Sequence, residues 1–155
     1  MFTTVLLIIH GLLAVALLGA VTHQAISVWW KARKPADSFV SRVRAVPATS
    51  YANAVVWLYV ISTILGGVIY PDYRLNVRVV LEQMQMPMAN GSFELKEHLA
   101  VLGLACLPAY WYFWRAPLAE RYTRTRAALT LFIAFIVWWN FLIGHILNNI
   151  RGFGS

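Results

Sequence analysis

The sequence predicts an all-α integral membrane protein, a four-helix bundle in which the chain runs up, down, up and down. Two observations predict this fold class. Of the 155 residues, 60% are hydrophobic and 12% are charged, whereas an ordinary soluble domain has about 25% charged residues. The apolar residues also come in blocks about as long as the ~20 residues that a membrane-spanning helix needs. Four such spans with short connections use nearly the whole chain, so residues 1–155 are expected to form a single transmembrane domain.

The first predicted helix covers about residues 4–30. Its apolar run is longer than that of a secretory signal peptide and has no basic start, so we interpret it as a retained helix. Trp29 and Trp30 mark one membrane interface, because such side chains collect at the headgroup level. The second predicted helix covers about residues 51–70 and is expected to end at Pro71.

An outer connection joins the second helix to the third. Apolar residues recur there at spacings of three and four, which predicts a short surface helix over about residues 73–86. Asn90-Gly91-Ser92 then predicts a turn. The third predicted helix covers about residues 93–114 and ends in an aromatic belt, and the fourth covers about residues 127–147.

The positions of the basic residues predict the orientation of the chain. Most of them flank apolar spans in the first and third connections: Lys31, Arg33, Lys34, Arg42, Arg44, Arg115, Arg121, Arg124 and Arg126. The positive-inside rule places these two connections in the cytoplasm, so both termini are expected on the outer side (N-out/C-out) of a multi-pass protein of the inner cell membrane. The formal charge of +7 therefore indicates contact with lipid headgroups and excludes nucleic acid, because no basic face is left over.

All four histidines lie in or at the ends of the apolar spans, where an ionisable side chain is costly and is by default a functional-site hypothesis. His10, His98 and His145 are expected at similar depth near the outer face, because successive helices alternate in direction and rise about 1.5 Å per residue. Imidazoles from facing helices can supply both axial ligands of a b-type haem in the bundle core. If the four helices form a square, the first and third helices lie on a diagonal, which favours His10 and His98 as the two axial ligands. His145 then binds a propionate or a quinone, or replaces one of the two ligands.

His23 lies nearer the cytoplasmic end of the first helix. It is a candidate for an inner quinone site, for a structural hydrogen bond or for a second haem. A straight helix places His10 and His23 about 140° apart, and no other histidine lies in the cytoplasmic half of the predicted spans to pair with His23. One haem is therefore the leading expectation, and two remain open.

The start of the third helix offers a different kind of site. Glu94 and His98 share a helix face at spacing i, i+4, so together with His10 and His145 they also fit a non-haem transition-metal site. The plainer alternative is a first turn whose acidic residues complement the helix dipole, with Lys96 reaching outward.

Inward histidines on four helices with a basic cytoplasmic face resemble the small membrane b-type cytochromes. That resemblance implies electron transfer between quinol pools, haems and external acceptors. The chain is also similar in layout to the HemJ-type protoporphyrinogen oxidase and copper-resistance membrane family, which has a histidine early in helix one and a lysine at the start of helix three. His10 and Lys96 fill those positions, although Ala-Leu-Leu-Gly at 16–19 replaces the Trp-Phe-Gly signature. Either resemblance implies a bound tetrapyrrole.

The sequence thus leaves three functions open. The first is a membrane b-haem protein that carries electrons between a quinone pool and an outer-side redox partner, alone or as a subunit of a respiratory complex. The second is a cofactor-free membrane anchor or assembly subunit, and the third is a HemJ-like tetrapyrrole oxidase. The expected partners are the lipid bilayer, a quinone or redox protein, and a larger membrane complex or a second copy of the chain.

Overall fold

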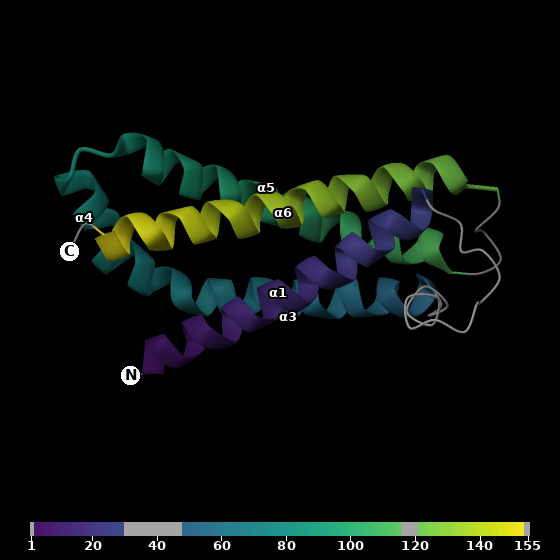
Figure 1. Cartoon of the computed structure of the whole chain (residues 1–155), viewed down its shortest axis with the longest axis horizontal. Helices are drawn as coiled ribbons and strands as arrows, with labels where there is room; N and C mark the ends of the chain where they lie inside the picture. Colours follow the sequence, from purple (N-terminus) through teal and green to yellow (C-terminus); the bar gives the residue numbers. More distant parts are fainter. Residues whose placement is uncertain (1, 30–47, 116–120, 154–155) are drawn as a thin grey trace.

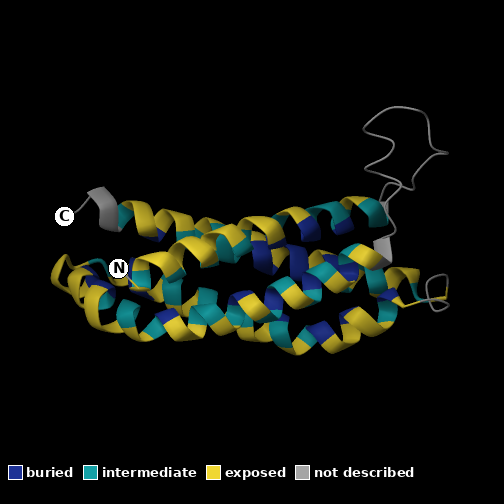
Figure 2. Ribbon diagram, turned by 90° about the horizontal axis from the view of Figure 1, so that it is seen from below, coloured by how far each residue is buried: buried dark blue, intermediate teal, exposed yellow. Residues whose placement is uncertain are grey.

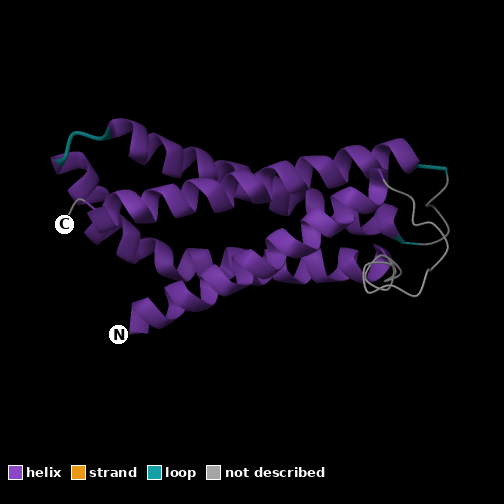
Figure 3. Cartoon of the chain, viewed as in Figure 1, coloured by secondary structure: helices purple, strands orange, loops and turns teal. Residues whose placement is uncertain are grey.

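The structure, a computed structural model, describes residues 2–29, 48–115 and 121–153. Every regular element in these ranges is a helix (Figure 3), which confirms the all-α prediction for this part of the chain. The elements are α1 (Phe2–Trp29), α3 (Ala48–Asp72), the π-helix η1 (Tyr73–Val77), α4 (Arg78–Gln83), α5 (Pro87–Trp114) and α6 (Thr123–Phe153).

Three stretches of helix in the described ranges are long and apolar enough to cross a membrane. They are Phe2–Val28, Ser50–Gln83 and Thr123–Ile150, in which an 18-residue window has a mean hydropathy of 2.5, 1.9 and 2.0, respectively. These helices indicate a membrane protein. The fourth long helix, α5, is not among them, because it carries Glu94, Lys96 and Glu97 near its start and is rich in tyrosine and tryptophan near its end.

The two ends of the bundle carry different parts of the chain (Figure 1). Both chain termini and the turn between α4 and α5 lie at one end, which we call the terminal end. The last residues of α1, the first residues of α3, the end of α5 and the start of α6 lie at the opposite end. The positions of the basic residues predict that the terminal end lies on the outer side of the membrane.

The prediction that Pro71 ends the second helix is wrong. Pro71 lies inside α3, and the helical path continues through the π turn of η1 directly into α4. Proline removes one backbone hydrogen bond, but the chain stays helical on both sides of Pro71. The predicted surface helix over 73–86 is therefore an extension of α3 in two segments.

The turn at the terminal end lies before Asn90 and not at it. The backbone N–H groups of Gln85 and Met86 donate to the carbonyl oxygens of Glu82 and Leu81 at 3.0 and 2.9 Å, and Gln85 has a φ of 53°. This is the Schellman arrangement that ends many helices. Proline at the first position of α5, Pro87, then starts the next helix, so the predicted turn at Asn90-Gly91-Ser92 is wrong.

Two hydrophobic clusters hold the helices together, and the buried residues lie on the sides where helices face one another (Figure 2). The main core includes Leu17 and Val21 of α1, Val55 of α3, Tyr110 of α5 and Ile133 of α6. A smaller terminal cluster consists of Val77, Leu81, Ala89 and Leu147. The main core fills the middle of the bundle and its opposite end, whereas the terminal cluster joins η1, α4, α5 and α6.

Three tryptophan side chains link neighbouring helices by hydrogen bonds in the half that holds the main core. The indole nitrogen of Trp111 on α5 donates to Asn53 on α3 at 2.9 Å, and that of Trp114 on α5 donates to Thr130 on α6 at 3.0 Å. Trp138 on α6 donates to Thr22 on α1 at 3.1 Å. These bonds fix the helices relative to one another in the half of the bundle that holds the main core. His10 and His145 lie nearer the terminal end.

Candidate functional site

A cavity lies between the main core and the terminal cluster, surrounded by all four long helices. It has a terminal lobe of about 240 Å³ and a middle lobe of about 110 Å³. Together the lobes reach the lower part of the range of small-molecule pockets, about 300–1,000 Å³. Seven residues line both lobes: His10, Ala14, Gly66, Lys96, Glu97, Asn140 and Phe141.

His10 reaches the cavity from α1. Its imidazole is half-buried, and its Nδ1 atom is buried without a hydrogen-bond partner. Its Cε1 atom lies 3.6 Å from the position that a Cβ on Gly66 of α3 would occupy, so the ring lies beside α3. A buried ring nitrogen without a partner is unusual in a folded protein, and here it belongs to a residue that lines a space able to hold a ligand.

Lys96 reaches the same cavity from α5. Its Nζ atom forms an ion pair with Glu97 Oε1 at 2.9 Å, and the lysine side chain is only 17% exposed. The ammonium also lies 4.6 Å from the centre of the Phe93 ring, a distance at which a cation and a ring attract each other. The cavity therefore contains a half-buried positive charge with one acidic partner.

His145 lines the terminal lobe from α6. Its ring is exposed and lies parallel to that of Phe141, with 6.4 Å between centroids and 2° between planes. The structure thus brings His10 and His145, from two neighbouring helices, to one cavity.

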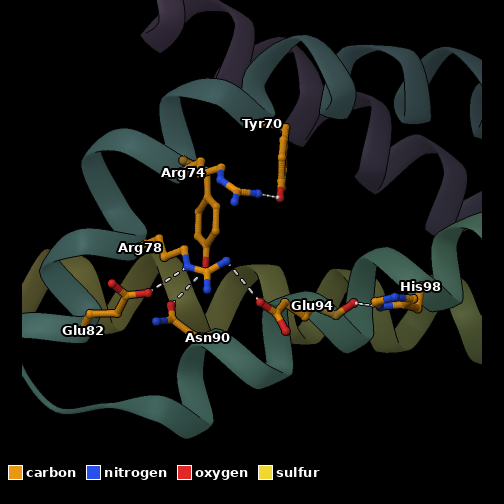
Figure 4. A network of polar contacts seen from close by, with 8 residues as sticks. Tyr70, Arg74, Arg78, Glu82, Asn90, Glu94 and His98 are labelled. Atoms are coloured by element: carbon orange, nitrogen blue, oxygen red, sulfur yellow. Dashed lines mark hydrogen bonds and ion pairs between the residues drawn. The ribbon is translucent and has the colours of Figure 1, made fainter.

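His98 is placed differently from the other two terminal-half histidines. It is exposed, lines neither lobe, and its Nδ1 atom lies 2.7 Å from the carbonyl oxygen of Glu94 in its own helix (Figure 4). The Glu94 carboxylate accepts a hydrogen bond from Arg78 at 3.2 Å, and Arg78 also pairs with Glu82 at 2.8 Å. Among the residues that the structure describes, no three histidine, cysteine, aspartate or glutamate side chains gather as a metal site.

His23 lies outside the cavity, in the half of the bundle that holds the main core. Its ring stacks on Tyr51 of α3, with 3.7 Å between centroids and 14° between planes, and its Nδ1 atom is buried without a partner. The structure therefore separates His23 from the other three histidines, as its position in the sequence predicts.

Sequence reasoning missed much of the cavity wall. Tyr70, Tyr73 and Phe93 form a stacked aromatic group, in which Tyr73 and Phe93 lie parallel at 3.5 Å between centroids, and all three line the terminal lobe. Asn140 lies inside the apolar run of α6 and lines both lobes. Its polarity inside a predicted membrane span is a signal that could have identified it.

Comparison of the chain with protein-family models, with curated proteins and with solved structures finds no match.

Proposed function

We propose that the protein is a membrane b-haem protein that carries electrons between a quinone pool and an outer-side redox partner, and that His10 and His145 are the residues that would hold the haem iron. One observation carries this proposal: both imidazoles line a single cavity between the helices, and His10 offers a buried nitrogen without a partner. Neutral imidazole nitrogens are the usual axial ligands of a b-type haem held in a helical bundle. A bound haem supplies a one-electron redox centre.

The remaining walls of the cavity suit the same ligand. The aromatic group of Tyr70, Tyr73 and Phe93 offers flat apolar surface to a planar macrocycle. Lys96 supplies a positive charge for an acidic side group of the ligand. These residues bind and orient, and the apolar main core below them excludes water from the middle of the bundle.

We further propose that α5 is a fourth membrane span and that the terminal end faces outward across the inner membrane. The basic residues at the opposite end favour this orientation. The charges at the start of α5 are compatible with a span, because Lys96 pairs with Glu97 and Glu94 pairs with Arg78 near the terminal end. The cavity then lies close to the outer surface, where an outer partner approaches.

The test is the reduced-minus-oxidised optical spectrum of the protein purified after expression with ample haem. We expect a b-type spectrum that is lost in His10→Ala and in His145→Ala. His98→Ala and His23→Ala serve as controls, because these histidines lie outside the cavity, and both should keep the spectrum. A wild-type protein without haem absorbance contradicts the proposal. In that case a cofactor-free anchor subunit predicts that the same variants change only stability.

A second candidate function, tetrapyrrole oxidation, is favoured by a different pair of residues. His10 and Lys96, the two positions that resemble the HemJ-type family, both line both lobes of the cavity. This candidate predicts that the purified protein oxidises protoporphyrinogen and that Lys96→Met abolishes this activity while the bundle stays folded. Electron transfer without that activity supports the first candidate.

A further inference from the structure

The exposed residues around the terminal lobe all come from two helices. Leu7 and Gly11 on α1 and His145 and Asn148 on α6 are exposed. Every lining residue that α3, η1 and α5 contribute is buried or half-buried. The cavity is therefore closed on the side of α3 and α5 and open along the line between α1 and α6.

The end of the cavity nearest the chain termini is covered. The terminal cluster of Val77, Leu81, Ala89 and Leu147 joins η1, α4, α5 and α6 there. Arg78 links α4 to the start of α5 through Glu94, and the Tyr73 hydroxyl donates to Asn90 Oδ1 at 3.3 Å. The main core closes the other end. Neither end of the bundle thus offers the ligand a wide path.

The two helices that border the opening, α1 and α6, are joined by a hydrogen bond that lies away from the opening. Trp138 and Thr22 connect α6 to α1 in the half of the main core. Figure 1 shows α1 diverging from α6 toward its N-terminal end. The surface beside the opening is apolar, with Ile8, Leu142 and Ile146 exposed by 59%, 48% and 50%. In a bilayer, such a surface contacts acyl chains and not water.

We propose that the cavity takes up its ligand sideways from the bilayer, through an opening between the terminal halves of α1 and α6 bordered by Leu7, Gly11, His145 and Asn148. The identity of the ligand, a lipid-soluble tetrapyrrole, rests on the proposed function, whereas the opening rests only on the exposure of these residues. A planar apolar molecule dissolved in lipid reaches the opening without crossing the polar surface at the terminal end.

A pair of glycine variants tests the route. A Cβ on Gly11 or on Gly19 meets no heavy atom within 4 Å, and both glycines are exposed on α1. Of these two glycines, Gly11 lines the cavity and Gly19 does not. Protein without ligand, reconstituted in phosphatidylcholine vesicles, is mixed with vesicles that carry haemin, and the rise of the Soret band is followed. We expect Gly11→Trp to slow the rate of haemin uptake at least about tenfold, which corresponds to about 1.4 kcal/mol of activation free energy. The rate of uptake by Gly19→Trp should equal that of the wild type. Equal rates in the two variants overturn the proposal.

A second experiment needs no haem. In a Cys106→Ser background, Ala14→Cys places a thiol on the wall of both lobes. Pyrene maleimide, which partitions into lipid, should label this thiol faster than a sulfonated, membrane-impermeant maleimide, and Gly11→Trp should suppress that labelling. Faster labelling by the impermeant reagent overturns the proposal. If the labelling holds and no haem binds, the opening stands and the proposed function fails.

Discussion

The Tyr59 side chain of α3 lies against the backbone of Gly103 on α5 and donates a hydrogen bond to the carbonyl oxygen of Ala100 at 2.9 Å. A Cβ on Gly103 would overlap the tyrosine hydroxyl and ring, and it would lie 3.3 Å from Ile136 Cγ2 of α6. Tyr59 is 4% exposed and lines the middle lobe of the cavity. A glycine at position 103 therefore sets both the approach of α3 to α5 and the position of one cavity wall.

Gly103→Ala should destabilise the bundle by about 1–3 kcal/mol, the usual cost of overpacking a core. The new methyl group forces Tyr59 out of its position and away from its hydrogen bond to Ala100, because the methyl carbon would overlap the tyrosine hydroxyl and ring. Thermal unfolding in detergent measures the effect. Gly67→Ala is the matched control, since a Cβ there meets no heavy atom within 4 Å. Equal unfolding temperatures for the two variants would show that α3 and α5 do not approach as described.

Thr130→Val should also destabilise the protein, through a different mechanism. Thr130 is 0% exposed and accepts the hydrogen bond of the buried Trp114 indole at 3.0 Å. Valine has nearly the same shape but leaves the indole N–H without a partner, which costs about 1–3 kcal/mol. Unfolding of Thr130→Val, Trp114→Phe and the double variant forms a cycle. The double variant should lose less than the sum of the single losses, and simple additivity would contradict the described bond.

The apolar blocks located the long helices, but local signals failed at two of their ends. Pro71 predicted a stop, yet its cost is one backbone hydrogen bond, and the π turn after it keeps the chain helical. Asn90 predicted a turn, yet it is 9% exposed inside α5, where its side chain accepts a hydrogen bond from Tyr73. Contacts across the terminal end decide both positions, and a single sequence does not reveal them.

The depth of the histidines follows from counting residues along the helices, but their rotation about the helix axes does not. His10 and His145 turn toward the cavity, whereas His98 turns outward and lies beside its own helix carbonyl. The start of α5 at Pro87 sets that rotation together with the packing of Phe93 on Tyr73. The helices do form a square in which α1 and α5 lie on a diagonal, because each of them contacts both α3 and α6. His98 nevertheless lies outside the cavity, which brings together His10 and His145.

Gln85→Gly should stabilise the protein. Gln85 has a φ of 53° in the turn after α4, a left-handed conformation that costs a residue with a side chain about 1–2 kcal/mol and costs glycine almost nothing. We expect a gain of about 1 kcal/mol, seen as a higher unfolding temperature. Gln83→Gly is the control with the opposite sign, because Gln83 is the last residue of α4 and glycine weakens a helix. A loss of stability in Gln85→Gly would show that the turn has another conformation.

If the cavity holds haem as proposed, Lys96→Met should weaken its binding without unfolding the bundle. The lysine side chain is 17% exposed in the cavity wall and pairs with Glu97 at 2.9 Å, so it can offer a charge-assisted hydrogen bond to an acidic group of the ligand. Such a bond contributes about 1.5–3 kcal/mol, which corresponds to roughly a ten- to hundredfold weaker affinity in haem titration. Lys96→Arg keeps the charge and should retain most of the affinity. His98→Ala, whose ring lies outside the cavity, should bind haem as the wild type does. If Lys96→Met binds haem with unchanged affinity, the ammonium does not contact the ligand, and the haem lies elsewhere or differently oriented in the bundle.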